Sequence, residues 1–303
     1  MQTDLRKTTQ LRRLIEQPGM LVMPGVYDPM GAKLVELAGF AAIQCTGAGI
    51  SGTYLGLPDY STLGMTDMVT VTGHIAAAVD IPVMGDGDTG FGNAVNTWYA
   101  IQAFERAGAA GVNIEDQVMP KRCGHLDGKV VIPLDEAVAK IRAAADARID
   151  KDFVINARTD ALAVHGIEEV IRRGNAYLDA GATMIFVEGT TSAKEIAAAV
   201  NGISGPVGVN IVHGGKSASD LDLADLEMLG VARVSLPGLL LAASLKAMDD
   251  VLRAVKASGS ISGVGDRMYG FKDAHALAGM GQVAELEKRY LAPLKIQKKS
   301  GSL

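Results

Sequence analysis

Residues Val83-Met84-Gly85-Asp86-Gly87-Asp88-Thr89-Gly90 decide the fold class, because a short apolar strand is followed at once by carboxylates and glycines. Residues Gly111-Val112-Asn113-Ile114-Glu115 repeat this design one segment later. Near-continuous apolar strands that alternate with helical patterns are typical of a parallel sheet covered on both faces. Strands of this kind are predicted eight times along the chain, at 21–26, 41–46, 82–86, 111–115, 153–158, 184–188, 207–211 and 232–236.

Eight strand–helix units predict an α/β fold that closes into a (β/α)₈, or TIM-type, barrel. Between the strands, apolar residues recur at helical spacing, for example over 94–107 and 134–147, and several of these patterns end on Ala-Gly. An open, doubly wound sheet is the alternative. That fold is disfavoured because no phosphate-binding glycine fingerprint follows the first strand.

The C-terminal part of the chain continues beyond what a barrel requires. Residues 239–258 have the pattern of one helix and 284–291 that of part of another, with a glycine- and serine-rich connection at 259–265. Residues 298–303 have the composition of a frayed tail. We therefore expect a single barrel domain over 1–303, in which 239–303 form a C-terminal helical extension.

Composition restricts the class of protein. The chain has 303 residues, 48% of them apolar, and a net charge of −5, with no basic cluster of the kind that binds nucleic acid. Cys45 and Cys123 are too few for a disulfide framework. The longest strongly apolar run, 239–245, is too short to cross a bilayer, and the N-terminus lacks a secretory hydrophobic core. We expect a cytoplasmic protein that acts on neither nucleic acid nor membranes.

Polar side chains gather at the ends of the predicted strands. In a (β/α)₈ barrel the carboxyl ends of all strands meet at one mouth, where active sites form. The sequence therefore predicts a site at this mouth, built from Asp28, Thr46, Asp86, Asp88, Glu115, Arg158, Glu188 and Asn210.

Three acids at this mouth suggest a metal. Asp86 and Asp88 leave one strand two positions apart, and Glu115 ends the next strand. Hard divalent cations prefer oxygen ligands, so we predict Mg²⁺, with Mn²⁺ possible, held by one direct carboxylate while the other acids hold its waters. Zinc is disfavoured because no Cys/His ligand set has suitable spacing.

A basic loop follows the fourth strand. Cys123 lies between Lys121, Arg122 and His125, and such positive neighbours favour the thiolate form of a cysteine. A small residue in an ordinary basic loop is an equally good interpretation of this stretch alone. The segment Thr46-Gly47-Ala48-Gly49 supplies backbone N–H groups for an oxyanion, or only a tight turn.

Five motifs, in this order, resemble the isocitrate lyase/phosphoenolpyruvate mutase superfamily over nearly the whole chain. They are Gly56-Leu57-Pro58-Asp59, the glycine- and acid-rich segment at 85–92, Ile114-Glu115-Asp116-Gln117, Lys121-Arg122-Cys123-Gly124-His125 and Ala157-Arg158-Thr159-Asp160-Ala161. The resemblance implies a (β/α)₈ barrel that binds a 2-oxo acid, or its enolate, through Mg²⁺. It also implies a homotetramer in which C-terminal helices swap between subunits.

The resemblance also assigns roles to residues. It implies that Cys123 protonates the departing carbanion and that Lys121, Arg122 and His125 complete a closed gating loop. It further implies acids around the metal at Asp59, Asp86, Asp88 and Glu115, and substrate-binding positions at Arg158, Glu188 and Asn210. Thr46, Gly47 and Ala48 are expected to bind substrate through their backbone N–H groups.

The activity implied is Mg²⁺-dependent cleavage of a short-chain 2-hydroxy dicarboxylate or tricarboxylate, of the 2-methylisocitrate or 2,3-dimethylmalate type. Two departures from 2-methylisocitrate lyases stand out: Gln44 in place of a tyrosine, and His213-Gly214-Gly215-Lys216 after the seventh strand. The Gly-Gly-Lys form is more similar to dimethylmalate lyases and carboxyphosphonoenolpyruvate mutases. A phosphonate mutase or an oxaloacetate-cleaving enzyme is therefore the alternative. A non-catalytic binding protein that has lost its activity is disfavoured, because Asp86, Asp88, Glu115 and Cys123 are all present.

Overall fold

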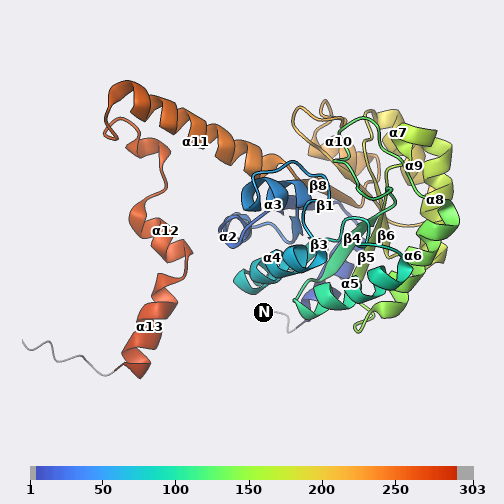
Figure 1. Cartoon of the computed structure of the whole chain (residues 1–303), viewed down its shortest axis with the longest axis horizontal. Coiled ribbons are helices and arrows are strands. Elements are labelled where there is room, and N and C mark those ends of the chain that lie inside the picture. The colour runs from blue at the N-terminus through green and yellow to red at the C-terminus, as the bar shows by residue number, and fades with distance from the viewer. Residues whose placement is uncertain (1–4, 292–303) are drawn as a thin grey trace, which may run out of the picture. The chain divides into compact units, whose positions relative to one another are not determined.

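Eight parallel strands form a closed barrel in the order β1 to β8, as predicted (Figure 1). The structure is a computed structural model that describes residues 5–291. The strands are β1 (Leu21–Val26), β2 (Ile43–Cys45), β3 (Val83–Asp86), β4 (Gly111–Glu115), β5 (Val154–Thr159), β6 (Met184–Val187), β7 (Val207–Asn210) and β8 (Arg233–Leu236). The predicted strand at 41–46 is shorter than expected, because Thr46 already caps the following helix.

Helices surround the barrel and cover its outer face (Figure 1). They are α2 (Pro29–Leu37), α3 (Gly47–Tyr54), α4 (Met65–Ala78), α5 (Ala94–Arg106), α6 (Leu134–Ala147), α7 (Leu162–His165), α8 (Ile167–Asp179), α9 (Ala193–Gly202) and α10 (Leu223–Met228). Helix α1 (Lys7–Glu16) precedes the first strand, and α11 (Leu239–Ser258) follows the last. The patterns at 94–107 and 134–147 correspond to α5 and α6, and 239–258 to α11.

The core has an outer layer between strands and helices and a plug at the amino-terminal end of the barrel. In the plug, Leu11 and Ile15 of α1 are buried against Leu21, Met23 and Met84 of the strands. Removing this much apolar surface from water is the main stabilising term for the barrel. The plug leaves the opposite, carboxyl end of the barrel free to form the site.

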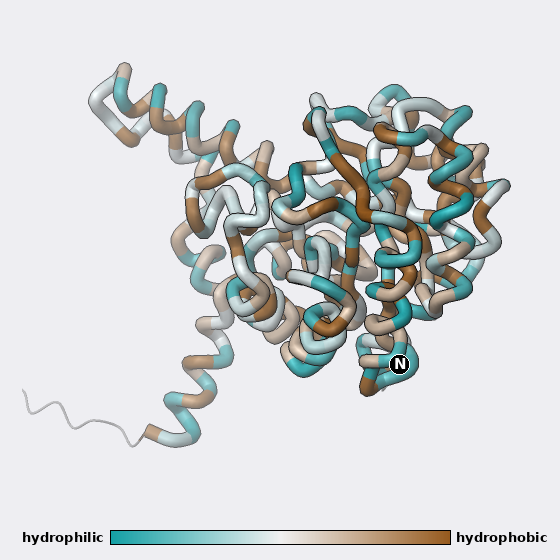
Figure 2. Tube along the Cα trace, turned by 45° about the vertical axis from the view of Figure 1, so that its right-hand side comes forward, coloured by the Kyte–Doolittle hydropathy of each residue, from teal (hydrophilic) through white to brown (hydrophobic). Residues whose placement is uncertain are grey.

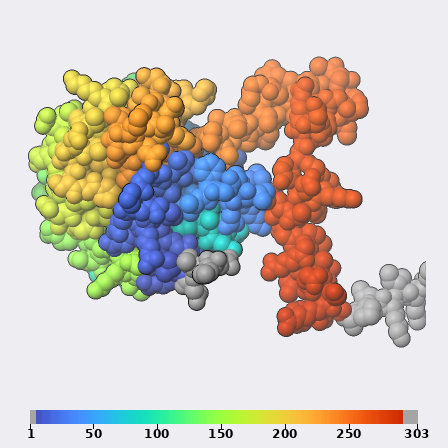
Figure 3. Space-filling view, turned by 180° about the vertical axis from the view of Figure 1, so that it is seen from behind, coloured from blue at the N-terminus to red at the C-terminus, as the bar shows by residue number. Residues whose placement is uncertain are grey.

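The barrel closes where its first strand meets its last. β1 and β8 are paired in parallel, and in Figure 3 the N-terminal segment in blue lies against the yellow-to-orange segment that precedes α11. Gly25 is required at this seam, since a Cβ there would lie 2.5 Å from the Cα of Pro237. Both residues stand at the carboxyl end of the barrel, so the seam helps to shape the mouth.

The chain divides into two compact units, Met1–Leu245 and Lys246–Leu303, and the division falls within α11. After α11 come a 3₁₀ turn (Gly265–Arg267), α12 (Phe271–Leu277) and α13 (Met280–Tyr290). Apolar residues recur along these helices (Figure 2), and several are exposed to solvent, including Leu252, Phe271, Leu286 and Tyr290. The predicted tail at 298–303 lies outside the described residues. None of the described helices is long and apolar enough to cross a membrane.

Candidate active site

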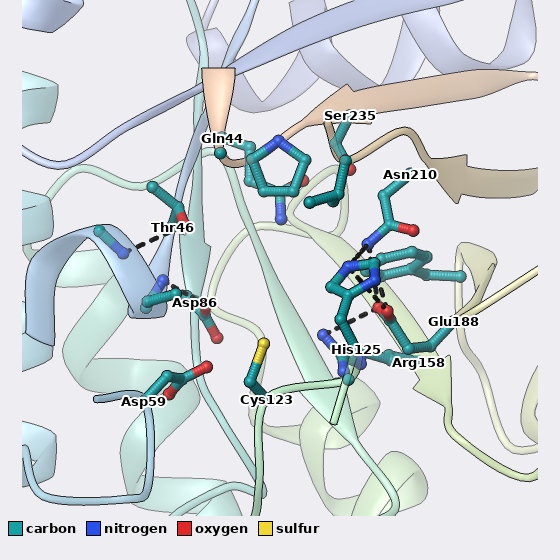
Figure 4. Close-up of a pocket in the computed structure, with 18 of the residues that line it drawn as sticks. Gln44, Thr46, Asp59, Asp86, Cys123, His125, Arg158, Glu188, Asn210 and Ser235 are labelled. Atoms are coloured by element: carbon teal, nitrogen blue, oxygen red, sulfur yellow. Dashed lines mark hydrogen bonds and ion pairs between the residues drawn. The ribbon is translucent and has the colours of Figure 1, made fainter. Parts of the chain in front are cut away.

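A pocket of about 120 Å³ opens at the carboxyl end of the barrel, where the sequence predicts the site (Figure 4). Its walls come from the ends of seven strands or the loops that follow them. The lining includes Gln44, Thr46, Gly47, Ala48, Asp59, Asp86, Lys121, Cys123, His125, Arg158, Phe186, Glu188, Asn210 and Ser235. Most of the predicted site residues are thus brought together, although Asp28 instead caps α2 by accepting a hydrogen bond from Gly31 N at 2.7 Å.

Lys121 joins two of the acids. Its Nζ lies 2.6 Å from Asp59 Oδ1 and 2.9 Å from Asp88 Oδ1, and all three side chains are largely buried. Burial raises the pKa of Asp88 to about 6, although the charge of Lys121 opposes this shift. Burial also raises the pKa of Glu115 well above its usual range, against the attraction of Arg158. A further positive charge near these two buried carboxylates would stabilise their ionised forms.

The acids fit a hard cation, although they are not arranged as a finished metal site. Among residues 5–291, no three His, Cys, Asp or Glu side chains form a group that could hold a metal ion. Asp86 Oδ2 accepts a hydrogen bond from Gly47 N at 2.7 Å, and Asp88 Oδ1 is paired with the Lys121 ammonium at 2.9 Å. Carboxylate oxygens are the ligands that a hard cation prefers, and Asp86 lines the pocket, so the chemistry of these acids suits such an ion or its waters. Asp86 and Asp88 therefore remain the predicted ligands, with Glu115 behind them.

The helix α3 begins at the edge of the pocket. Thr46 is its N-cap, with Oγ1 accepting a hydrogen bond from Gly49 N at 3.4 Å. Thr46, Gly47 and Ala48 all line the pocket. A helix N-terminus carries partial positive charge and unsatisfied N–H groups, which favour a bound anion. The sequence allowed either an anion-binding segment or only a tight turn at 46–49. In the structure this segment is the first turn of α3.

Arg158 connects Glu115, at the end of β4, to Glu188, which follows β6. Its Nε lies 3.1 Å from Glu115 Oε2 and its Nη1 lies 3.2 Å from Glu188 Oε2. Asp160 binds the same guanidinium through two hydrogen bonds, of 2.8 and 3.1 Å. Such a bidentate pair fixes the plane of the guanidinium. Sequence reasoning did not assign a role to Asp160, although it stands within the motif quoted for Arg158.

His125 closes the opposite side of the pocket. Its Nε2 lies 3.3 Å from Glu188 Oε1, and its Nδ1 lies 3.2 Å from the backbone oxygen of Lys216. Asn210 Nδ2 donates to Glu188 Oε2 at 3.1 Å, so Asn210, His125 and Arg158 all contact the Glu188 carboxylate. The basic loop is therefore closed over the barrel and touches the segment after β7.

Cys123 is half-buried in this loop, and its sulfur points into the pocket between the acids and His125 (Figure 4). Burial raises the pKa of the Cys123 thiol, whereas the sequence predicted that its basic neighbours favour the thiolate. That prediction is wrong, because desolvation outweighs the attraction of Arg158. A thiol that stays protonated is the form that a proton donor requires.

Arg122 is a predicted catalytic residue that points elsewhere. Its guanidinium lies 5.7 Å from the centre of the Tyr60 ring, and its Nη1 donates to the backbone oxygen of Asp127 at 3.2 Å. Its backbone nevertheless belongs to the closed loop, since Gln117 Nε2 donates to Arg122 O at 2.9 Å. In this arrangement Arg122 supports the loop and does not line the pocket.

Comparison with known proteins agrees with this geometry. Residues 11–256 match the family model for phosphoenolpyruvate phosphomutase. The chain is 40% identical to the 2,3-dimethylmalate lyase of Eubacterium barkeri over 94% of this chain and 99% of that protein. It is 39% identical to the 2-methylisocitrate lyase of Aeropyrum pernix over 89% of this chain and 86% of that protein.

A solved structure of phosphonopyruvate hydrolase, in complex with oxalate and Mg²⁺, is also similar. It has a TM-score of 0.86 and 33% identity and covers 95% of this chain and 100% of that one. The fold, the motifs and these relatives lead to one assignment. The chain belongs to the phosphoenolpyruvate mutase family, and it is an enzyme of the isocitrate lyase/phosphoenolpyruvate mutase superfamily.

Proposed function

We propose that the protein is a Mg²⁺-dependent carbon–carbon lyase that cleaves a short-chain 2-hydroxy dicarboxylate or tricarboxylate, of the 2,3-dimethylmalate or 2-methylisocitrate type. The products are a 2-oxo acid such as pyruvate and a second carboxylate. The observation that carries the proposal is the position of Cys123, which lines the same pocket as the acids from the closed loop and whose thiol pKa is raised by burial. The two lyases to which the chain is similar support the same reaction class.

Retro-aldol cleavage makes three demands on the site. A carboxylate that lines the pocket accepts the proton of the substrate hydroxyl, the bond between C2 and C3 breaks, and its electron pair passes to C3 as a carbanion conjugated with the second carboxylate. Cys123, which lines the same pocket, then donates its proton to C3, and the thiolate regains a proton from water once the products leave. When bound, Mg²⁺ would polarise the oxygen of the forming 2-oxo acid.

The other residues hold the substrate and exclude water. Arg158 and the N-terminus of α3 offer binding groups for carboxylate oxygens. Lys121 and His125 hold the loop closed through their contacts with Asp59 and Glu188. The closed loop keeps solvent water away from the carbanion. We place the enzyme in the cytoplasm, since both Cys45 and Cys123 are free thiols.

A phosphonate mutase is the second candidate, because the matching family model is that of phosphoenolpyruvate phosphomutase. The two are separated by offering 2,3-dimethylmalate, 2-methylisocitrate, oxaloacetate and phosphonopyruvate in turn with Mg²⁺, and following the products by ¹H and ³¹P NMR. We expect pyruvate from at least one of the first two. Rearrangement of phosphonopyruvate, without cleavage of either hydroxy acid, would assign the mutase.

We also propose a homotetramer in which the C-terminal helices pack on a neighbouring subunit. Exposed side chains of these helices, among them Leu252 (69%), Phe271 (79%) and Tyr290 (67%), form apolar surface that a soluble monomer would normally cover. Light scattering is expected to give four times the 31.6 kDa of the chain. Leu252→Glu should lower that mass, and a monomer at micromolar concentration of the unmodified protein would contradict the proposal.

A further inference from the structure

Lys129 is a buried cation that the reaction described above does not use. It follows the basic loop in sequence, and only 8% of its surface is exposed. Its Nζ donates one hydrogen bond to the backbone oxygen of Gly124, at 2.6 Å, and another to Asp160 Oδ1, at 3.0 Å. An ammonium group is costly to bury unless it is paired, so these two contacts are what makes its position tolerable.

The two partners of Lys129 belong to different parts of the site. Gly124 stands in the loop between Cys123 and His125. Asp160 follows β5, where its N–H donates to Asp116 Oδ1 at 2.9 Å and its carboxylate holds Arg158. The charges of Arg158 and Lys129 lower the pKa of Asp160 to about 2 despite its burial, so this carboxylate is ionised at neutral pH. Lys129 thus ties the loop backbone to the anchor of the substrate-binding arginine.

The loop is also in close contact with the barrel at Gly124. A Cβ at this position would lie 2.4 Å from Glu188 Oε1 and 2.5 Å from Arg158 Nη2. The backbone therefore rests directly on these two side chains, with no room for a larger residue. The hydrogen bond from Lys129 to the Gly124 carbonyl fixes how the adjacent Cys123 is presented to the pocket.

We propose that Lys129 is a positioning residue that latches the loop in its closed form and so sets the place of the Cys123 thiol. This inference rests on the proposed role of Cys123 in proton donation. Loss of the latch should leave the groups on the barrel strands in place, because Arg158 keeps its contacts with Glu115 and Glu188. The expected effect is on kcat more than on KM, by about 10²-fold, the scale for a misplaced reacting group.

The test measures the loop independently of turnover. Full-length Lys129→Met is treated with iodoacetamide without substrate, and alkylation of Cys123 is followed by peptide mass spectrometry. Cys45 is fully buried and serves as an internal reference. The matched control is Lys7→Met, since Lys7 also donates to two backbone oxygens, those of Ala76 and Val79, but from α1 at the other end of the barrel.

Alkylation of Cys123 should be about tenfold faster or more in Lys129→Met, as expected when hydrogen bonds from a charged group are lost, and unchanged in Lys7→Met. Lys129→Arg should restore part of the protection and part of kcat. If Lys129→Met does not fold, Lys129→Gln, which removes the charge but keeps a polar amide, carries the same comparison. Alkylation of folded Lys129→Met, or of folded Lys129→Gln in its place, at the parent rate overturns the inference. A parent enzyme that cleaves no hydroxy acid overturns the proposed function, and the alkylation result then still decides whether the latch exists.

Discussion

Asp88→Ala is expected to reduce turnover by at least about 10³-fold, the scale seen when one preorganised electrostatic group is removed from an active site. Asp88 is buried, with a pKa that burial raises to about 6, and its carboxylate is paired with the Lys121 ammonium at 2.9 Å. Lys121 keeps its ion pair with Asp59 when Asp88 is removed, so the loop retains an anchor while the predicted cation loses a ligand. The fold should be kept with some loss of stability, because Lys121 loses one of its two buried partners.

The measurement is kcat/KM at saturating Mg²⁺ together with a thermal melt by circular dichroism. Asp67→Ala is the control, since Asp67 accepts a hydrogen bond from Gly64 N at the exposed start of α4, remote from the chemistry. Loss of that cap should cost about 1 kcal/mol of stability with little change in rate. An Asp88→Ala enzyme with near-normal turnover would show that this acid is structural.

Cys123→Ser should retain substrate binding but lose about 10²–10⁴-fold in kcat, the usual contribution of general acid catalysis. A serine hydroxyl is a far weaker acid than a thiol, and no other thiol lines the pocket among the described residues. KM should change little, because the carboxylate-binding groups stay in place. Steady-state kinetics that follow pyruvate release check both parameters.

Cys45→Ala is the matched control for this variant. Cys45 ends β2 and is fully buried, so its truncation should lower stability but leave the rate of cleavage close to that of the parent. If Cys123→Ser cleaves at the parent rate with saturating substrate, Cys123 is a passive loop residue. The strongest reason to prefer a lyase over a mutase would then be lost.

The strands were predictable because a parallel strand in a barrel is buried on both sides and so shows as an apolar run. β1 and β4 were predicted with the bounds that the structure shows. The plug formed by α1 was not predicted, because its three basic residues, Lys7, Arg12 and Arg13, make the segment look like a solvent-exposed helix. Leu11 and Ile15 of α1 contact the strand residues only after the barrel has closed, so the sequence alone does not reveal the plug.

The site was predictable to the extent that strand ends must meet at one mouth. The sequence did not show which side chains contact one another once the chain is folded. Asp160 stands within the motif of Arg158 but was given no role, and Lys129 belongs to none of the five motifs. Their roles emerge only when the loop and β5 are brought together. The raised pKa of Cys123 was missed for a similar reason, since sequence shows its charged neighbours but not how deeply the thiol is buried.

The most direct test of the account is pyruvate formation from 2,3-dimethylmalate or 2-methylisocitrate by the parent enzyme, followed by ¹H NMR, after EDTA treatment and again after Mg²⁺ is restored. The account predicts cleavage of at least one of these acids with Mg²⁺, no measurable cleavage after EDTA, and recovery on adding Mg²⁺ back. Cleavage at full rate in metal-free buffer, or no cleavage of either acid with Mg²⁺, would contradict it.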